Sequence, residues 1–389
     1  MTGALLHPGS TLPAPRTDPA ALRERVDRIA ARVDHHLDLL CPGTAQAACA
    51  AWLPAGELPG AGRPSAPVLG RRLQRALSAP IRHLVEASGR RWRPVLSWET
   101  VRLLGGDGER CGPLMAAMEL LHTGSLIVDD VQDGSPLRRG RPTVHQVFGA
   151  PTALNAGTAA YFLWERAVQL TFPEDAARAG ELRALLLAAL RAGHAGQALD
   201  LQGHREEMDQ AVAGGDPGVV LDLVRLTHRL KSGVPAASGM EMAAVVTGAA
   251  PELRTALAAF GSAVGTAYQI ADDVADLRGV TQAGAPTKLT AEDLRNGKVS
   301  MPLAHAVGRL PRPRLDPLWR RVRDGSLEGT ALVRAAGELE DCGAVAACRE
   351  EADRLLHDAW LRLSPLLPEA GRRPLYDLAV LIVRGRQAT

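Results

Sequence analysis

The segment MELLHTGSLIVDDVQDGSPLRRGRPTVHQVFG, residues 118–149, begins with an apolar run and continues into an acidic and then a basic cluster. The acidic residues are Asp129, Asp130 and Asp133, and the basic ones are Arg138, Arg139 and Arg141. A solvated helix usually mixes its charges instead of sorting them along the chain. The order therefore indicates a segment that binds a ligand.

The acidic cluster has the spacing of a helical metal site. On a helix Asp129 and Asp133 are four residues apart, so their carboxylates project from one face and repel each other. A cation between them relieves the repulsion, and ligands that are all oxygen suit Mg²⁺, which shares substrate phosphates and keeps waters. Because one such motif also arises by chance, an ordinary solvated helical face is the alternative.

A second acidic cluster repeats the same spacing in GTAYQIADDVADLRG, residues 265–279. Its aspartates are Asp272, Asp273 and Asp276. Two such clusters could clamp one diphosphate through several metal ions. Basic groups that could bind phosphate are spread along the chain, at Arg90, Arg91, Arg93, Lys231, Lys288 and Lys298.

Composition limits the class of protein. Of the 389 residues 46% are hydrophobic and 23% charged, which is ordinary for a soluble protein with a sizeable core. The net charge of +2 argues against nucleic acid or an anionic membrane surface as a partner. There is no CxxC pair among the five cysteines, no leader pattern and no apolar run of about 18 residues. We expect a cytoplasmic protein without a membrane span.

The pattern along the chain predicts an all-α protein. Alanine, leucine, arginine and glutamate dominate long segments, and the alternation typical of strands is scarce. Residues 17–40 form an amphipathic pattern with Leu22, Val26, Ile29, Val33 and Leu37 on one stripe. Residues 41–67 are rich in Pro, Gly and Ala and are expected to form a loop or poorly ordered linker. We therefore expect an N-terminal extension, residues 1–67, before the main folded domain, residues 68–389.

Seven motifs, in order over residues 68–389, resemble those of the trans-isoprenyl diphosphate synthases, or polyprenyl synthetases. SGRRWRP resembles GGKxxRP, residues 119–145 the first aspartate-rich region, GQALDL the GQxxD segment and KSG the KTG segment. YQIADDVADL resembles FQxxDDxxD, KLTAEDLRNGKVSMPL resembles KxxGxDLxxGKxTLP, and LIVRGR resembles the basic C-terminus. LIVDDVQDGSPLRRGRP and PTALNAGTAAYFLWE are most similar to eukaryotic-type geranylgeranyl diphosphate synthases.

The resemblance implies the isoprenoid synthase fold, a single bundle of long helices around a deep central cavity with both aspartate clusters at its mouth. It also implies a homodimeric prenyltransferase that condenses isopentenyl diphosphate with an allylic diphosphate, using Mg²⁺, three ions per active site. The expected product is geranylgeranyl diphosphate, with 20 carbons.

The same resemblance assigns roles to individual residues. The metal ligands would be Asp129, Asp133, Asp272 and Asp276. The catalytic groups would be Asp129, Asp130, Asp133, Lys231, Asp272 and Asp273. Isopentenyl diphosphate would be bound by Arg90, Arg93, His122 and Arg139. The allylic diphosphate would be bound by Arg138, Lys231, Lys288 and Lys298, with Ser232 and Gln269 lining the reacting centre.

Chain length would depend on two further pairs of residues. Gly124 and Ser125 stand where short-chain members often place an aromatic wall, so that position is expected to be open. Tyr161 and Phe162 would form the floor of the cavity, unless they only pack between helices.

Four residues depart from the family pattern, and two other functions stay open. Ser88 stands in place of a usual glycine, and Val128 where many bacterial members have histidine. Arg90 replaces a lysine, and Pro235 follows KSG where a proline would strain a helix. A class I terpene cyclase needs no second diphosphate site, which the matches at Arg90, Arg93 and Arg139 provide. A non-catalytic partner subunit would have lost aspartates from one cluster, whereas both clusters are complete. Without the resemblance, His122 would be read as a core histidine.

Overall fold

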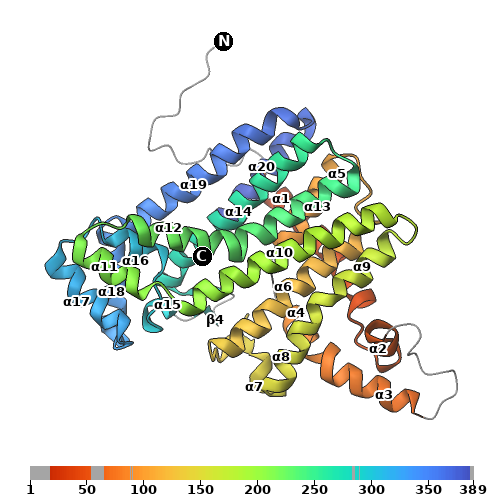
Figure 1. Ribbon diagram of the computed structural model, residues 1–389, viewed down its shortest axis with the longest axis horizontal. Coiled ribbons are helices and arrows are strands. Elements are labelled where there is room, and N and C mark those ends of the chain that lie inside the picture. The colour runs from red at the N-terminus through yellow and green to blue at the C-terminus, as the bar shows by residue number, and fades with distance from the viewer. Residues whose placement is uncertain are drawn as a thin grey trace. The chain divides into compact units, whose positions relative to one another are not determined.

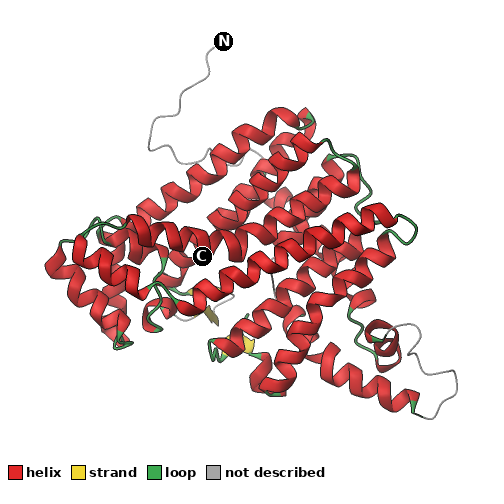
Figure 2. Cartoon of the chain, in the orientation of Figure 1, coloured by secondary structure: helices red, strands yellow, loops and turns green. Residues whose placement is uncertain are grey.

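The computed structural model describes residues 18–53, 65–87, 89, 91–282, 285–288 and 290–385. These residues are almost entirely helical, as Figure 2 shows. The exceptions are two short antiparallel hairpins, β1 (Leu137–Arg138) with β2 (Arg141–Pro142) and β3 (Val280–Gln282) with β4 (Ala285–Lys288). The prediction of an all-α protein is confirmed.

The chain divides into two compact units, which are described separately. The unit called here the N-terminal unit comprises Ala20–Leu185 and Met242–Ala249. Of the described residues, the C-terminal unit comprises 18–19, Leu186–Glu241 and those from Ala250 onwards.

The N-terminal unit is built around a helix that carries the first aspartate cluster. This helix, α6 (Gly112–Gln132), packs against α4 (Ala79–Val85), α5 (Trp92–Leu103), α8 (Ala150–Ala159) and α9 (Leu163–Thr171). Ten consecutive residues of α5, Trp92 to Val101, are buried, so this helix lies inside the unit. The remaining elements are α3 (Ala66–Leu73), the π-helical turn η2 (Gln74–Ser78), α7 (Val144–Phe148) and the 3₁₀ turn η3 (Ala160–Phe162).

Helix α1 (Pro19–Leu40) matches the predicted amphipathic helix. Leu22, Ile29, Val33 and Leu37 are buried and Val26 is half-buried, so the predicted stripe is the packed face. Arg25 Nε donates to Glu99 Oε1 of α5 at 2.7 Å. The first helix is therefore a packed part of the N-terminal unit.

The prediction of a loop or linker over residues 41–67 is wrong in part, because α2 (Ala45–Trp52) lies within it. The sequence AQAACAAW has high helix propensity, and the Pro and Gly residues only flank it. The helix packs against α3, and Trp52 Nε1 donates to Ser78 Oγ at 2.9 Å. Residues 54–64 of the predicted linker lie outside the described residues.

The C-terminal unit is built around α14 (Pro251–Arg278), which carries the second aspartate cluster. Figure 1 shows α19 (Ala344–Leu363) and α20 (Glu369–Arg384) beside it, and both pack against it. The Trp360 ring lies between those of Phe260 and Tyr376 and is tilted against both, with centroid distances of 5.6 Å to Phe260 and 5.0 Å to Tyr376. The other elements are α11 (Arg205–Gly214), α12 (Gly218–His228), the π-helical turn η4 (Arg229–Gly233), α15 (Glu292–Arg295), α16 (Met301–Ala306), α17 (Arg312–Arg323), α18 (Gly329–Asp341) and the 3₁₀ turn η5 (Ser364–Leu366). Helices α10 (Ala176–Gln202) and α13 (Val234–Thr247) have residues in both units.

The expected strain at Pro235 is accommodated by a local change of helix type. A proline inside a helix lacks an N–H and its ring clashes with the carbonyl four residues earlier, here that of Lys231. The chain widens into the π-helical turn η4 just before this proline, which is the second residue of α13. A glycine of α14 then packs directly on η4, because a Cβ at Gly265 would lie 2.2 Å from Ser232 O.

Glu351 joins three helices of the C-terminal unit. Its Oε1 accepts a hydrogen bond from Arg225 Nε of α12 at 2.6 Å, and its Oε2 lies 3.1 Å from His305 Nε2 of α16. The side chain is only 8% exposed. Burial alone would raise the pKa of Glu351, but hydrogen bonds from His305 and Arg225 lower this pKa to about 2.

This lowered pKa predicts how stability depends on pH. The folded-state pKa of Glu351 lies below the ordinary value of 4.5, so the unfolded state binds more protons between these values. The stabilisation is therefore present above pH 4.5 and is lost as the pH falls towards 2, by at most ~3 kcal/mol. We expect Glu351→Gln to lower the free energy of unfolding at pH 7 and to flatten its decline below about pH 5. Urea unfolding at several pH values measures both, with the exposed neighbour variant Glu350→Gln as control; equal slopes in the two variants would contradict the assignment.

Candidate functional site

The first aspartate cluster lies at the C-terminal end of α6. Asp129 is half-buried and Asp133 is exposed, and the Asp133 amide donates to the Asp129 carbonyl at 2.9 Å. The last turn of α6 contains no basic residue. Because the C-terminal end of a helix carries a partial negative charge, acidic side chains there are unfavourable unless a cation binds.

Asp130 has a different environment from its two neighbours. It is fully buried, and its Oδ1 accepts a hydrogen bond from Arg138 Nε at 2.7 Å. Its Oδ2 has no hydrogen-bond partner among the described residues. Burial raises the pKa of Asp130, although Arg138 opposes the shift. Arg138, expected at the allylic diphosphate, is thus held by this carboxylate in the structure.

The β1–β2 hairpin places the arginines that follow. Arg138 pairs with Arg141, which leaves Arg139 and Gly140 as a two-residue loop with φ of 52° and 74°. Positive φ at both positions is the pattern of a type I′ turn, which joins tightly paired strands. The turn therefore sends Arg138 and Arg139 to different partners.

His122 of α6, about two helical turns before Asp129, lies beside Arg93 of α5. Arg93 Nη1 lies 3.2 Å from His122 Nε2, and the Arg93 guanidinium stacks 4.3 Å over the Trp92 ring. Burial lowers the pKa of His122 well below its usual range, and Arg93, Arg139, Arg138 and Arg91 lower it further. The ring is therefore neutral at pH 7. Because arginine only donates, Nε2 must accept and the proton is assigned to Nδ1.

Two of the residues expected to bind phosphate, Arg90 and Lys288, cannot be placed in the site. Arg90 lies outside the described residues. Lys288 is the last residue of β4, but its side chain is also outside the description. Their assigned roles stay predictions.

In the second cluster, near the C-terminal end of α14, the three aspartates also differ. Asp272 is half-buried, whereas Asp273 and Asp276 are buried. Asp273 Oδ2 accepts from the Met301 amide at 2.9 Å and lies 3.2 Å from His228 Nε2. Burial would raise the pKa of Asp273, but His228 and the Met301 amide hold it below its usual range. This aspartate therefore fixes α14 to α12 and α16.

Asp276 also has a structural contact. It is 0% exposed, and its Oδ2 accepts a hydrogen bond from the Asp293 amide at 3.1 Å. The contact ties α14 to the segment that precedes Lys298. Its expected role as a metal ligand stays a prediction, and Asp272 is the more accessible carboxylate of this cluster.

Sequence reasoning missed the role of Asp200. This residue, on α10, lies 2.5 Å from Lys231 Nζ and 3.0 Å from Lys298 Nζ. Burial would raise the pKa of Asp200, but the two lysines lower it well below its usual range. Asp200 therefore holds together two cations that the resemblance assigns to the allylic diphosphate. The GQALDL match contained this residue but gave no reason to expect both lysines beside it.

Ser232 and Gln269, expected at the reacting centre, are in contact. Ser232 Oγ donates to Gln269 Oε1 at 2.7 Å, and Gln269 Nε2 lies 3.5 Å from Asp273 Oδ1. The close crossing of α14 and η4 at Gly265 brings them together.

The carboxylates fit a hard divalent cation in their chemistry. Asp129, Asp133 and Asp272 offer oxygen ligands open at least in part to solvent, and a cation would offset the charge at the end of α6. In the described part of the chain, no three His, Cys, Asp or Glu side chains lie close enough together to hold a metal ion by themselves. A cation bound by these aspartates would thus complete its coordination with substrate oxygens and water.

The expectation of open space at Gly124 is wrong. A Cβ at this position would lie 2.4 Å from Gly157 O and 2.9 Å from Ala160 Cβ. Gly124 therefore lets α6 approach α8 and η3 closely and leaves no room for an aromatic wall. Ser125 is half-buried, and its Oγ donates to His122 O at 2.8 Å.

This crossing predicts a large difference between two Gly→Ala variants. Gly124→Ala should destabilise the protein by about 2–4 kcal/mol, because the contact is with a backbone oxygen that cannot move aside. Gly180→Ala on α10, where a Cβ would meet no atom within 4 Å, should stabilise by about 0.5–1 kcal/mol. Urea unfolding measures both. A stable Gly124→Ala protein would show that the helices are not in this contact.

The assignment of Phe162 to a cavity floor is also wrong, because its side chain is 76% exposed. The 3₁₀ turn η3 directs adjacent side chains to different sides. Tyr161 is half-buried and its Cε1 lies within 3.2 Å of where a Gly124 Cβ would be. Burial raises the pKa of Tyr161 to about 12, with a smaller contribution from Asp129. A chain-length role thus stays a prediction for Tyr161 and Ser125.

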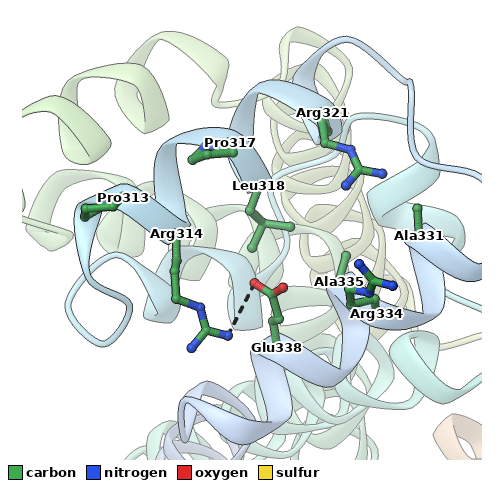
Figure 3. A pocket seen from close by; sticks show the side chains of 9 residues that line it. All are labelled: Pro313, Arg314, Pro317, Leu318, Arg321, Ala331, Arg334, Ala335 and Glu338. Carbon is green, nitrogen blue, oxygen red and sulfur yellow. Dashed lines mark ion pairs between the residues drawn. The ribbon is translucent and has the colours of Figure 1, made fainter.

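A small pocket lies between α17 and α18, away from all of these residues in sequence. Figure 3 shows its lining, which includes Arg314, Arg321, Arg334 and Glu338, around a volume of about 210 Å³. Arg314 Nη2 lies 3.7 Å from Glu338 Oε2, and the three arginines are exposed. It contains none of the predicted site residues, and we assign it no role.

Solved structures with the same fold identify the class of protein as isoprenyl synthases. A polyprenyl synthase from Caulobacter crescentus, complexed with calcium and isoprenyl diphosphate, is 26% identical with a TM-score of 0.71. The match covers 93% of this chain and 97% of that one. A geranylgeranyl pyrophosphate synthase from Corynebacterium glutamicum, complexed with isoprenyl diphosphate and magnesium, is 22% identical with a TM-score of 0.71, covering 93% and 99%.

Sequence comparison identifies the family. The model of the family described as Polyprenyl synthetase matches residues 74–323, and the chain therefore belongs to this family. A short chain isoprenyl diphosphate synthase of Methanocaldococcus jannaschii is 34% identical over 232 residues, which span 59% of this chain and 65% of that protein. The farnesyl diphosphate synthase of Geobacillus stearothermophilus is 33% identical over 270 residues, spanning 66% and 85%.

Proposed function

We propose that the protein is a trans-prenyltransferase that condenses isopentenyl diphosphate with an allylic diphosphate. The observation that carries the proposal is that the chain has two separate cationic groups. One consists of Arg93 and Arg139 in the N-terminal unit, with the neutral His122 ring 3.2 Å from Arg93 Nη1, and the other of Lys231 and Lys298 in the C-terminal unit. Two groups of this kind suit a reaction with two diphosphate substrates.

The residues can support each part of this reaction. The C1–O bond of the allylic diphosphate breaks, the isopentenyl double bond attacks C1, and the proton then lost passes to the departing diphosphate. Lys231 and Lys298 offer donors to the charge that develops on the leaving group. Arg93, Arg139 and the Nδ1–H of His122 would hold isopentenyl diphosphate. Mg²⁺ ions held by Asp129 and Asp133 in the N-terminal unit, and by Asp272 in the C-terminal unit, would neutralise diphosphate charge and polarise the bond that breaks.

A 20-carbon product and three Mg²⁺ ions are the finer parts of the proposal. The likeness of PTALNAGTAAYFLWE to geranylgeranyl diphosphate synthases supports the product length, although the relatives include farnesyl, geranylfarnesyl and octaprenyl diphosphate synthases. The two solved structures, complexed with isoprenyl diphosphate and with calcium or magnesium, support a divalent cation at the site. Mass spectrometry measures the length of the product, and metal titration measures the number of Mg²⁺ ions. A 15-carbon end product would exclude the proposed 20-carbon length.

We also propose a homodimer. Leu154 of α8 and Phe162 of η3, 39% and 76% exposed, are large apolar side chains that a second copy of the chain would cover. Light scattering of the purified protein tests this, and a monomeric mass would exclude it.

The compartment is also a proposal. None of the described helices combines the length and apolar composition that crossing a membrane requires. All five cysteines are free of disulfides, which supports the cytoplasm. Cell fractionation tests it, and recovery of the protein with membranes or outside the cell would contradict it.

A binding experiment separates this function from that of a terpene cyclase. Isopentenyl diphosphate is titrated by calorimetry into protein already saturated with Mg²⁺ and a non-reactive allylic thiodiphosphate. With two diphosphate sites, isopentenyl diphosphate still binds, with one molecule per chain. A cyclase has a single diphosphate site, so the absence of binding would overturn the proposal.

A further inference from the structure

Two arginines in an uncommon backbone conformation converge on one buried carboxylate. Arg91 and Arg139 have φ of 47° and 52°, a region that residues with a side chain rarely adopt unless surrounding contacts hold them there. Arg91 Nη1 donates to Glu119 Oε1 at 2.8 Å, and Arg139 Nη2 lies 3.4 Å from the same oxygen. Glu119 is only 2% exposed. This carboxylate therefore links the segment before α5 to the β1–β2 turn.

Arg91 has the contacts of an anchor. Its Nε donates to Asp34 Oδ1 of α1 at 2.9 Å, and its Nη2 donates to the Val85 carbonyl. With the bond to Glu119, all three guanidinium nitrogens have partners, and the residue is 7% exposed. Arg91 could bind a ligand only by giving up these contacts. It instead fixes the start of α5, where Arg93 follows two residues later.

Arg139 has the contacts of a group that can still bind an anion. Its other contact, from Nη1 to Leu84 O, is also 3.4 Å long, so both are weak. Its guanidinium lies against Gly89, where a Cβ would come within 2.9 Å of the Arg139 Cζ. The Arg139 side chain is thus positioned by its packing against Gly89 and by the Glu119 carboxylate that it shares with Arg91. Its N–H groups can still donate to an anion.

We propose that Asp34, on α1, is a positioning residue for the isopentenyl diphosphate site. Because Asp34 balances part of the charge of Arg91, the Glu119 carboxylate is shared between Arg91 and Arg139. Loss of the Asp34 charge lets Arg91 draw more strongly on Glu119 and loosens the segment that carries Arg93. The inference rests on the proposed function, and it gives α1, which precedes the family match at residue 74, a part in substrate binding.

The test is steady-state kinetics of Asp34→Asn, which keeps the shape and removes the charge. The KM for isopentenyl diphosphate should rise about tenfold, since a hydrogen bond to a charged group is weakened. The KM for the allylic diphosphate and kcat should change less than about twofold. Glu24→Gln is the matched control, because Glu24 lies on the same helix and pairs at 2.8 Å with Arg28 one turn away. It should behave as the wild type.

A double variant separates positioning from a general loss of stability. If Asp34 acts through Arg91, then Asp34→Asn combined with Arg91→Gln should have the same KM for isopentenyl diphosphate as Arg91→Gln alone. Additive losses, or equal rises in both KM values, would overturn the inference, as would a lowered melting temperature with unchanged kinetics. A wild-type protein that consumes no isopentenyl diphosphate would overturn the proposed function and this inference together. An active wild type with an unaltered Asp34→Asn variant would overturn the inference alone.

Discussion

Asp129→Ala should lower kcat by about a thousandfold while the protein stays folded, because a carboxylate that holds the metal at the leaving diphosphate is lost. Asp129 is half-buried at the end of α6, where three aspartates and no basic residue of the last turn meet the negative end of the helix. Removing one negative charge there should favour the helix and offset the loss of the long ion pair, 3.7 Å, between Asp129 Oδ2 and Arg138 Nη2. The expected result is therefore a large loss of turnover with an unchanged or raised melting temperature.

Steady-state kinetics at saturating Mg²⁺ and thermal unfolding measure the two quantities on the same preparation. Asp27→Ala is the control, since Asp27 is an exposed residue of α1 in the same unit. Turnover within a few-fold of the wild type in Asp129→Ala would remove Asp129 from the metal site.

Asp272→Ala should also reduce kcat by about a thousandfold, for the same reason. Within its cluster it is the aspartate with the most accessible side chain. Its neighbour Asp273 offers an internal contrast, because it accepts the Met301 amide at 2.9 Å and faces His228 at 3.2 Å. Asp273→Ala should therefore lower the melting temperature as well as the activity, whereas Asp272→Ala should lower only the activity.

Asp341→Ala at the end of α18 serves as the control, since this exposed aspartate also lies at the end of a helix. If Asp272→Ala loses stability in parallel with Asp273→Ala, then Asp272 is a packing residue and the account of the second cluster fails.

Some features of the fold and site could be predicted from the sequence because they depend on local pattern. The apolar stripe from Leu22 to Leu37 specifies α1, and the two aspartate runs lie near the ends of α6 and α14 as their helical spacing indicates. The missing N–H of Pro235 predicts a disturbed helix at this point. That the disturbance takes the form of a π-helical turn could not be predicted from the KSG motif.

Other features depend on neighbours that are distant in sequence, and these were missed. Gly124 looks like open space in the sequence, yet Gly157 occupies it from another helix. Asp200, Glu119 and Asp34 acquire their roles from arginines and lysines 20 to 98 residues away. Phe162 was judged by its residue type, whereas the 3₁₀ turn decides that it faces outwards.

The most direct test of the central claim is the fate of isopentenyl diphosphate with the purified wild-type protein and Mg²⁺. Dimethylallyl, geranyl and farnesyl diphosphates are supplied in turn, and products and released inorganic diphosphate are quantified. The account predicts prenyl diphosphates extended by five-carbon units, with one inorganic diphosphate released for each isopentenyl diphosphate consumed. A cyclised hydrocarbon formed without isopentenyl diphosphate, or no consumption of it with any of the three starters, would contradict the account.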